Sequence, residues 1–107
     1  MTRYGLVLRV RPEYEDSYIE YHKAVWPDVL ALIRECQIRN YSIFLKDHTL
    51  FAYFEYHGAD FEADMKKMAA SEAMRKWWDI MEPMQDPIPT RQPGEWWARM
   101  DEVFHTD

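Results

Sequence analysis

The sequence IRNYSIFLKDHTLFAYFEY, residues 38–56, decides the fold and contains two strand patterns. Residues 38–46 alternate in the manner of a strand with two different faces. One of these faces carries the large side chains Tyr41, Ile43 and Leu45. A short turn at Asp47 and His48 leads into the aromatic-rich run 49–56, so the stretch predicts an antiparallel hairpin with a solvated His48 at its tip.

A strand and a helix precede the hairpin. Residues 3–10 are a short β-rich run that ends before Pro12. Proline suits the first turn of a helix, and the acidic residues that follow it favour the positive end of the helix dipole, so a helix is predicted to begin near residue 12. Pro27 has no N–H and crowds the preceding turn. The helix should therefore kink or restart near Trp26, and its apolar face continues to about Cys36.

Further helices and a last strand follow the hairpin. Gly58 and Asp60 end the second strand and begin a helix with the apolar stripe Phe61, Met65, Met68 and Ala69. A second helical pattern starts at Ser71 and carries Met74, Trp77, Trp78 and Met81. Four prolines then predict an extended connection of about ten residues. Residues 96–105 are predicted to form the last strand.

This order of elements predicts an α+β, ferredoxin-like βαββαβ fold with a four-stranded antiparallel sheet and helices on one face. The 107 residues fit a single domain, residues 1–107. Tyr, Phe and Trp occur on both faces of the predicted sheet, although the helices can cover only one. A twofold homodimer that packs sheet on sheet into a dimeric α/β barrel would cover the other face.

Charge and cysteine content exclude several kinds of partner and location. The formal net charge is −6 without a Lys/Arg cluster, which argues against nucleic acid or an anionic membrane as the main partner. The one cysteine, Cys36, cannot form an internal disulfide and is expected to be a small buried residue of a reducing compartment. The apolar run of residues 5–8 is too short for a signal peptide or a membrane span, so a cytoplasmic location is expected.

The helix before the hairpin carries an unusual stripe for a core. Residues that recur every fourth position along one face are Tyr14, Tyr18, His22 and Trp26. Each of these side chains can bury its body and still offer a polar tip. A helix break at Pro27 would leave His22 beside unpaired backbone groups, which favours a polar pocket. A single histidine on an apolar face is, however, more often structural than catalytic.

The residues around His22 suit proton transfer on a polyhydroxy ligand. Trp can stack on the C–H face of a sugar, while Tyr and Asn40 can fix its hydroxyl groups. One positioned acid or base contributes about 10²–10⁴-fold to a rate, which is enough to open a hemiacetal. Motifs for nucleotide binding, metal binding and nucleophilic hydrolysis are missing, so neither a cofactor nor a metal is expected. The adjacent indoles of Trp77 and Trp78 lie about 100° apart on a helix, so one of them should meet a ligand or another subunit.

Segments over nearly the whole chain match a known family, in order and at similar spacing: Tyr18, His22-Lys-Ala-Val-Trp26-Pro27, Asn40-Tyr41-Ser42-Ile43, Trp77-Trp78 and Glu102-Val103-Phe104. With them the chain resembles the L-rhamnose mutarotase family. The resemblance implies a homodimeric α/β barrel that interconverts the α and β pyranose anomers of a 6-deoxy-L-hexose without a cofactor. It also implies that His22 is the catalytic proton donor and that the sugar is contacted by Tyr18, Tyr41, Trp77 and Trp78.

One segment departs from the family pattern. The loop after the tryptophan pair reads Gln85-Asp86-Pro87-Ile88-Pro89-Thr90-Arg91 and is followed by Gly94-Glu95-Trp96-Trp97. In this loop the chain looks like a relative that acts on L-fucose. The loop from Gln85 to Gly94, with Arg91 as its only full positive charge, is the candidate for reading the hydroxyl groups that distinguish the two sugars. Two other functions stay open on the same dimeric barrel: a binding module that holds a sugar or another small molecule without turnover, and a cofactor-free monooxygenase.

Overall fold

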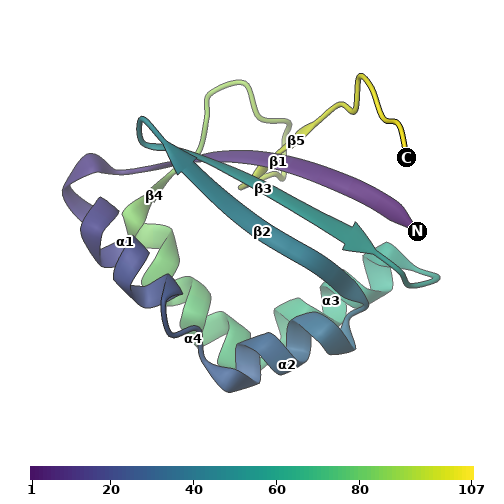
Figure 1. Cartoon of the computed structure of the whole chain (residues 1–107). Helices are drawn as coiled ribbons and strands as arrows, with labels where there is room; N and C mark the ends of the chain where they lie inside the picture. The colour runs from purple at the N-terminus through teal and green to yellow at the C-terminus, as the bar shows by residue number, and fades with distance from the viewer.

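The computed structural model describes residues 1–107 and consists of one curved antiparallel sheet with helices on one of its faces (Figure 1). In chain order the elements are β1 (Thr2–Val10), the 3₁₀ helix η1 (Pro12–Tyr14), α1 (Glu15–His22), α2 (Pro27–Glu35), β2 (Ile38–Lys46), β3 (Thr49–Tyr56), α3 (Phe61–Ala70), α4 (Glu72–Met81), the 3₁₀ helix η2 (Glu82–Met84), β4 (Gln85–Asp86) and β5 (Ala98–Met100).

The strand order β2-β3-β1-β4 confirms the predicted ferredoxin-like fold. The hairpin of β2 and β3 is also confirmed, since Lys46 pairs with Thr49 across a two-residue turn. Both turn residues, Asp47 and His48, have positive φ angles of 50° and 61°, as the tight turn of a twisted hairpin requires. The pairing of β2 with β3 shifts its register between Arg39 and Ser42, where a bulge interrupts the ladder.

Pro27 breaks the first helical segment at the predicted place. The helix α1 ends at His22, and α2 begins with Pro27 at its first position, where a missing N–H costs no intrahelical hydrogen bond. The break leaves His22 at the end of α1 and turns the chain so that α2 runs under the sheet (Figure 1).

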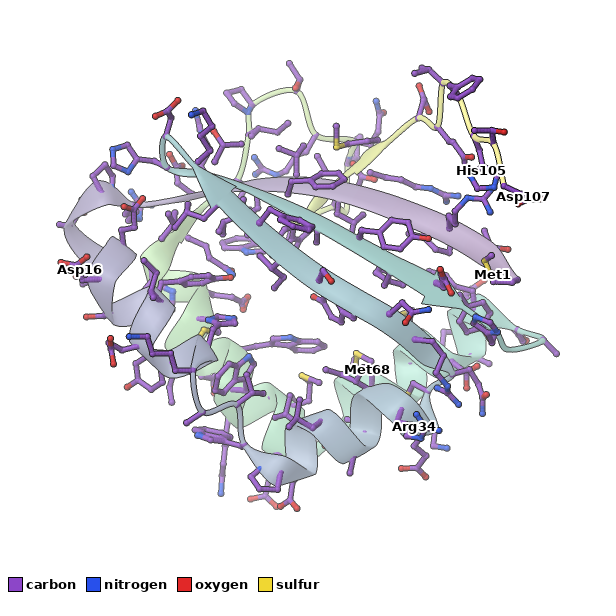
Figure 2. All side chains as sticks on the ribbon, viewed as in Figure 1. Met1, Asp16, Arg34, Met68, His105 and Asp107 are labelled. Atoms are coloured by element: carbon purple, nitrogen blue, oxygen red, sulfur yellow. The ribbon has the colours of Figure 1, made fainter.

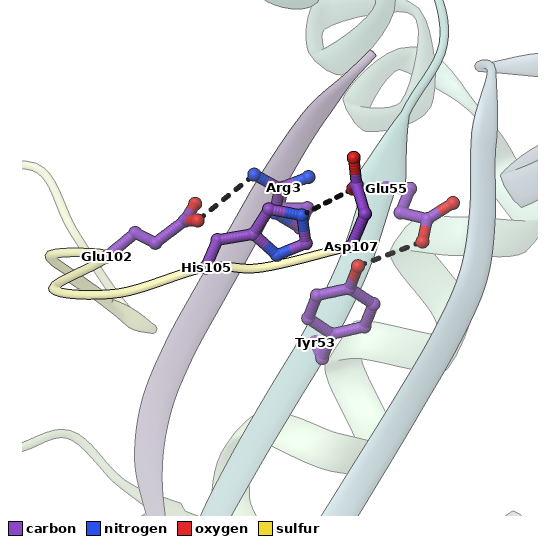
Figure 3. Close-up of polar contacts among 6 residues, drawn as sticks. All are labelled: Arg3, Tyr53, Glu55, Glu102, His105 and Asp107. Carbon is purple, nitrogen blue, oxygen red and sulfur yellow. Dashed lines mark hydrogen bonds and ion pairs between the residues drawn. The ribbon is translucent and has the colours of Figure 1, made fainter.

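The prediction of a last strand over residues 96–105 is wrong in its length. Only β5, residues 98–100, pairs with the middle of β1, while β4 pairs with the end of β1 at Arg9 and Val10. Two short segments thus share the position of the fourth strand. Beyond β5 the tail makes side-chain contacts instead of a ladder: Arg3 Nη2 donates to Glu102 Oε1 at 3.0 Å, and His105 Nε2 lies 3.1 Å from Asp107 Oδ1 (Figure 3).

The core lies between the sheet and the helices, where side chains fill the space around Met68 (Figure 2). Cys36 is fully buried there, as predicted. The opposite face of the sheet is open, and its apolar side chains Phe44, Phe51 and Met100 remain 60%, 38% and 45% exposed. None of the helices combines the length and the apolar character needed to cross a lipid bilayer.

Candidate functional site

A cavity of about 320 Å³ opens between α1, α4 and the sheet. Its walls are mainly aromatic and consist of Tyr18, His22, Tyr41, Ile43, Trp77, Trp78, Met81, Glu82, Gln85, Trp96 and Trp97. The volume is at the lower end of the range of about 300–1,000 Å³ that is usual for small-molecule sites. All the site residues implied by the sequence, namely His22, Tyr18, Tyr41, Trp77 and Trp78, therefore meet in one place.

Contacts hold His22 in a defined orientation, and burial favours its neutral form. Its ring lies 4.3 Å from the ring of Tyr18 and 5.5 Å from that of Trp77, measured between centroids. Nδ1 lies 2.7 Å from the backbone oxygen of Tyr18, and a carbonyl oxygen can only accept, so Nδ1 carries the proton. Burial lowers the pKa of His22, which favours the neutral ring, although the bond to Tyr18 opposes this effect. Near neutral pH the other nitrogen, Nε2, thus has a free lone pair.

The phenol of Tyr18 is buried beside the only polar side chain of the core. Gln85 is 5% exposed, and its Nε2 donates to the hydroxyl oxygen of Tyr18 at 3.2 Å. The other end of the same amide, Oε1, accepts from Nε1 of Trp96 at 2.8 Å. Burial raises the pKa of Tyr18, and the bond from Gln85 opposes the rise, so Tyr18 stays protonated at neutral pH.

The other predicted contact residues form the walls of the cavity. Tyr41 projects from β2, and desolvation together with the neighbouring Tyr18 raises the pKa of its hydroxyl. Tyr41 is 39% exposed as a residue, so this shift reflects the surroundings of the hydroxyl rather than burial of the whole side chain. Trp77 is buried and meets the ring of Trp26 edge-on at 5.1 Å, whereas Trp78 is only partly buried. Both indoles line the cavity.

Four residues of the sequence interpretation lie outside the cavity: Asn40, Tyr14, Trp26 and Arg91. Asn40 sits at the bulge with a φ of 50°, and its amide donates to Glu55 Oε1 at 2.8 Å. Tyr14 is exposed. Arg91 is exposed as well, and its Nη1 donates to the backbone oxygen of Ile88 at 3.1 Å within the proline-rich loop.

Six lining residues were not among the predicted contact residues: Ile43, Met81, Glu82, Gln85, Trp96 and Trp97. Gln85, Trp96 and Trp97 belong to the segment that departs from the family pattern, and the loop from Gln85 to Gly94 was the candidate for reading the sugar hydroxyl groups. No group of three or more His, Cys, Asp or Glu side chains is arranged to hold a metal ion. The cavity instead offers a neutral imidazole, a protonated phenol and aromatic walls.

The fold and the cavity define a ferredoxin-like α+β protein with a small aromatic site built around one histidine. A family model described as L-rhamnose mutarotase matches residues 3–106, and the chain belongs to the L-rhamnose mutarotase family. Two relatives are L-rhamnose mutarotases of Oceanobacillus iheyensis and Ligilactobacillus salivarius. The first is 34% identical over 100% of both chains, and the second is 34% identical over 99% of this chain and 98% of the relative.

Solved structures agree with the fold. The crystal structure of an L-rhamnose mutarotase from Formosa agariphila superposes with a TM-score of 0.79 over 100% of both chains, at 26% identity. The tetracenomycin F2 cyclase of Streptomyces glaucescens superposes with a TM-score of 0.66 at 15% identity, over 99% of this chain and 96% of the cyclase. The second likeness concerns the fold alone.

Proposed function

We propose that the protein is a mutarotase that interconverts the α and β pyranose anomers of L-rhamnose. The observation that carries this proposal is that His22, with Nδ1 bonded to the backbone oxygen of Tyr18, lines the same small cavity as Tyr18. Family membership and the names of the relatives support L-rhamnose as the sugar.

The proposed reaction needs only proton transfers. His22 Nε2 takes the proton of the anomeric hydroxyl O1–H as the C1–O5 bond breaks and the C1=O1 bond forms. The ring oxygen O5 receives its proton from the hydroxyl of Tyr18. After rotation about the C1–C2 bond, the aldehyde closes on its other face, Tyr18 regains its proton, and His22 returns its own to O1. His22 thus acts as a base in the opening step and as a proton donor in the closing step.

The aromatic residues are proposed to hold the sugar. Trp77 and Trp78 offer apolar surface to the C6 methyl group and the C–H face, and Tyr41 offers a hydroxyl that remains protonated at neutral pH. Proton transfer alone balances this reaction, so the proposal includes no cofactor.

L-Fucose is a second candidate because Gln85, Trp96 and Trp97 come from the divergent segment and line the cavity. L-Rhamnose and L-fucose share the C6 methyl and differ at C2 and C4, so polar contacts must discriminate between them. Loss of one buried hydrogen bond costs about 1–3 kcal/mol, or up to roughly a hundredfold in rate. Saturation-transfer NMR on L-rhamnose, L-fucose and D-glucose tests the choice. Both 6-deoxy sugars should exchange faster than D-glucose, with one clearly preferred; equal enhancement on all three would refute recognition of the methyl.

A homodimer that covers the open face of the sheet completes the proposal. The rings of Phe44 and Phe51 stack at 6.2 Å on this face, and both are exposed. A twofold partner would bury them sheet on sheet. The rim of the same face carries the ion pair of Arg3 and Glu102, as a polar border around an apolar centre.

A further inference from the structure

We propose that Gln85 and Trp96 are positioning residues that direct the hydroxyl proton of Tyr18 into the cavity. This inference deepens the proposed mutarotase reaction and rests on it, because it explains how Tyr18 becomes a donor to the ring oxygen of the sugar. Neither residue is named by the family resemblance, and both come from the segment in which this chain departs from it.

The direction of the hydrogen bonds follows from the chemistry of Trp96. An indole Nε1–H can only donate, so the amide atom of Gln85 that faces it must be the oxygen. The amide NH₂ of Gln85 consequently faces Tyr18 and donates to its hydroxyl oxygen. A phenol that already accepts this bond keeps its own proton for another acceptor, and no protein atom accepts a hydrogen bond from the Tyr18 hydroxyl in this structure.

Two members of the relay formed by Trp96, Gln85 and Tyr18 belong to regular elements of secondary structure. The backbone of Gln85 pairs with Val10 in the β1–β4 ladder, while Tyr18 belongs to α1. Burial makes the amide costly to leave unpaired, so it keeps both of its partners. Trp96 joins the relay from the far end of the proline-rich loop, 11 residues after Gln85, and thereby also ties this loop to the cavity.

The opposite amide orientation would disable the proposed donor. If Oε1 of Gln85 faced Tyr18, the phenol would donate to the amide, and only lone pairs of its oxygen would face the cavity. The ring oxygen of a sugar is an acceptor, so it would then find no proton. Trp96 excludes this orientation, because a flipped amide would oppose its donor with a second donor.

Gln85→Glu tests the direction of the relay. The ionised carboxylate that this substitution introduces can only accept, so it should draw the Tyr18 proton away from the sugar and lower kcat about ten- to hundredfold at neutral pH. Protonation of this carboxyl group at lower pH restores a donor toward Tyr18. The ratio of the variant rate to the wild-type rate should therefore rise as the pH falls. Gln85→Met, which can neither donate nor accept, should lose activity with a ratio that does not change with pH.

Gln92→Glu is the matched control, because it adds the same charge to an exposed position of the same loop, outside the cavity. It should keep the wild-type pH profile. A Gln85→Glu protein with full activity, or with a rate ratio independent of pH, overturns the relay. If Gln85→Glu does not fold, Trp96→Phe takes its place. Loss of the indole donor frees the amide to flip, and kcat should fall about two- to tenfold. Unchanged kcat in Trp96→Phe would then overturn the relay.

A titration without sugar separates this inference from the proposed function. Tyrosine labelled with ¹³C at Cζ reports the pKa of Tyr18 by NMR. Removal of the donor in Gln85→Met should raise that pKa above the wild-type value, because the bond from Gln85 stabilises the phenolate. An unchanged pKa overturns the relay, whether or not the protein exchanges anomers. A wild-type protein without anomer exchange would instead refute the proposed function.

Discussion

Replacement of His22 by alanine should separate catalysis from stability. The change removes the imidazole at the end of α1 together with its contacts to Tyr18 and Trp77. Loss of the proton carrier should lower the exchange rate about 10²–10⁴-fold, which corresponds to about 3–5 kcal/mol of transition-state stabilisation. The side chain is only partly buried and makes one hydrogen bond, so the free energy of unfolding should fall by about 1–3 kcal/mol.

The assay combines anomer exchange by saturation-transfer NMR with thermal unfolding. A loss of about 1 kcal/mol lowers the Tm of a domain of this size by about 4–8 °C, so His22→Ala should remain folded at about 25 °C. His57→Ala serves as the control, because His57 is exposed and lies outside the cavity near Glu55. A folded His22→Ala protein that exchanges anomers within about threefold of the wild-type rate would refute the role of His22.

Three further predictions address pH, assembly and packing. Burial lowers the pKa of His22, so the acid limb of the kcat/KM profile should lie below about pH 6.5. The free energy of unfolding should fall as the pH drops from about 6.5 toward this lowered pKa. An acid limb at or above about pH 6.5 would contradict the lowered pKa of His22. Phe51→Asp should turn a homodimer into a monomer in light scattering, whereas Leu30→Asp, on an exposed helix position, should not; a monomeric wild type refutes the dimer. Gly58→Ala should cost at least about 1–3 kcal/mol in denaturant unfolding, because its Cβ would clash with the hydroxyl of Tyr56; wild-type stability would disprove the clash.

The elements that could be predicted depend on local chemistry. The alternation of β2 and its tight turn are properties of neighbouring residues, and so is the helix break that Pro27 imposes. The fold class followed from the order of such elements. Asn40 was misjudged because the bulge between Arg39 and Ser42 redirects the chain there, and alternation cannot reveal a bulge.

The remaining features depend on contacts between distant residues. The bond from Gln85 to Tyr18 spans 67 positions, so the sequence could assign the loop that begins at Gln85 to the sugar but could not predict this bond. The shortness of β5 has a similar cause, since the tail meets Arg3 through Glu102 and does not extend the ladder. The cavity residues found in advance came from a helical stripe and from the family resemblance, both of which are visible along the chain.

Transfer of saturation between the two anomeric protons of L-rhamnose is the most direct test of the proposed activity. The wild-type protein at micromolar concentration should increase the transfer between the α and β signals in proportion to its concentration, above the spontaneous exchange in buffer. Broadened or shifted sugar signals with an exchange rate that stays at the spontaneous value would contradict a mutarotase and identify a protein that binds the sugar without turning it over.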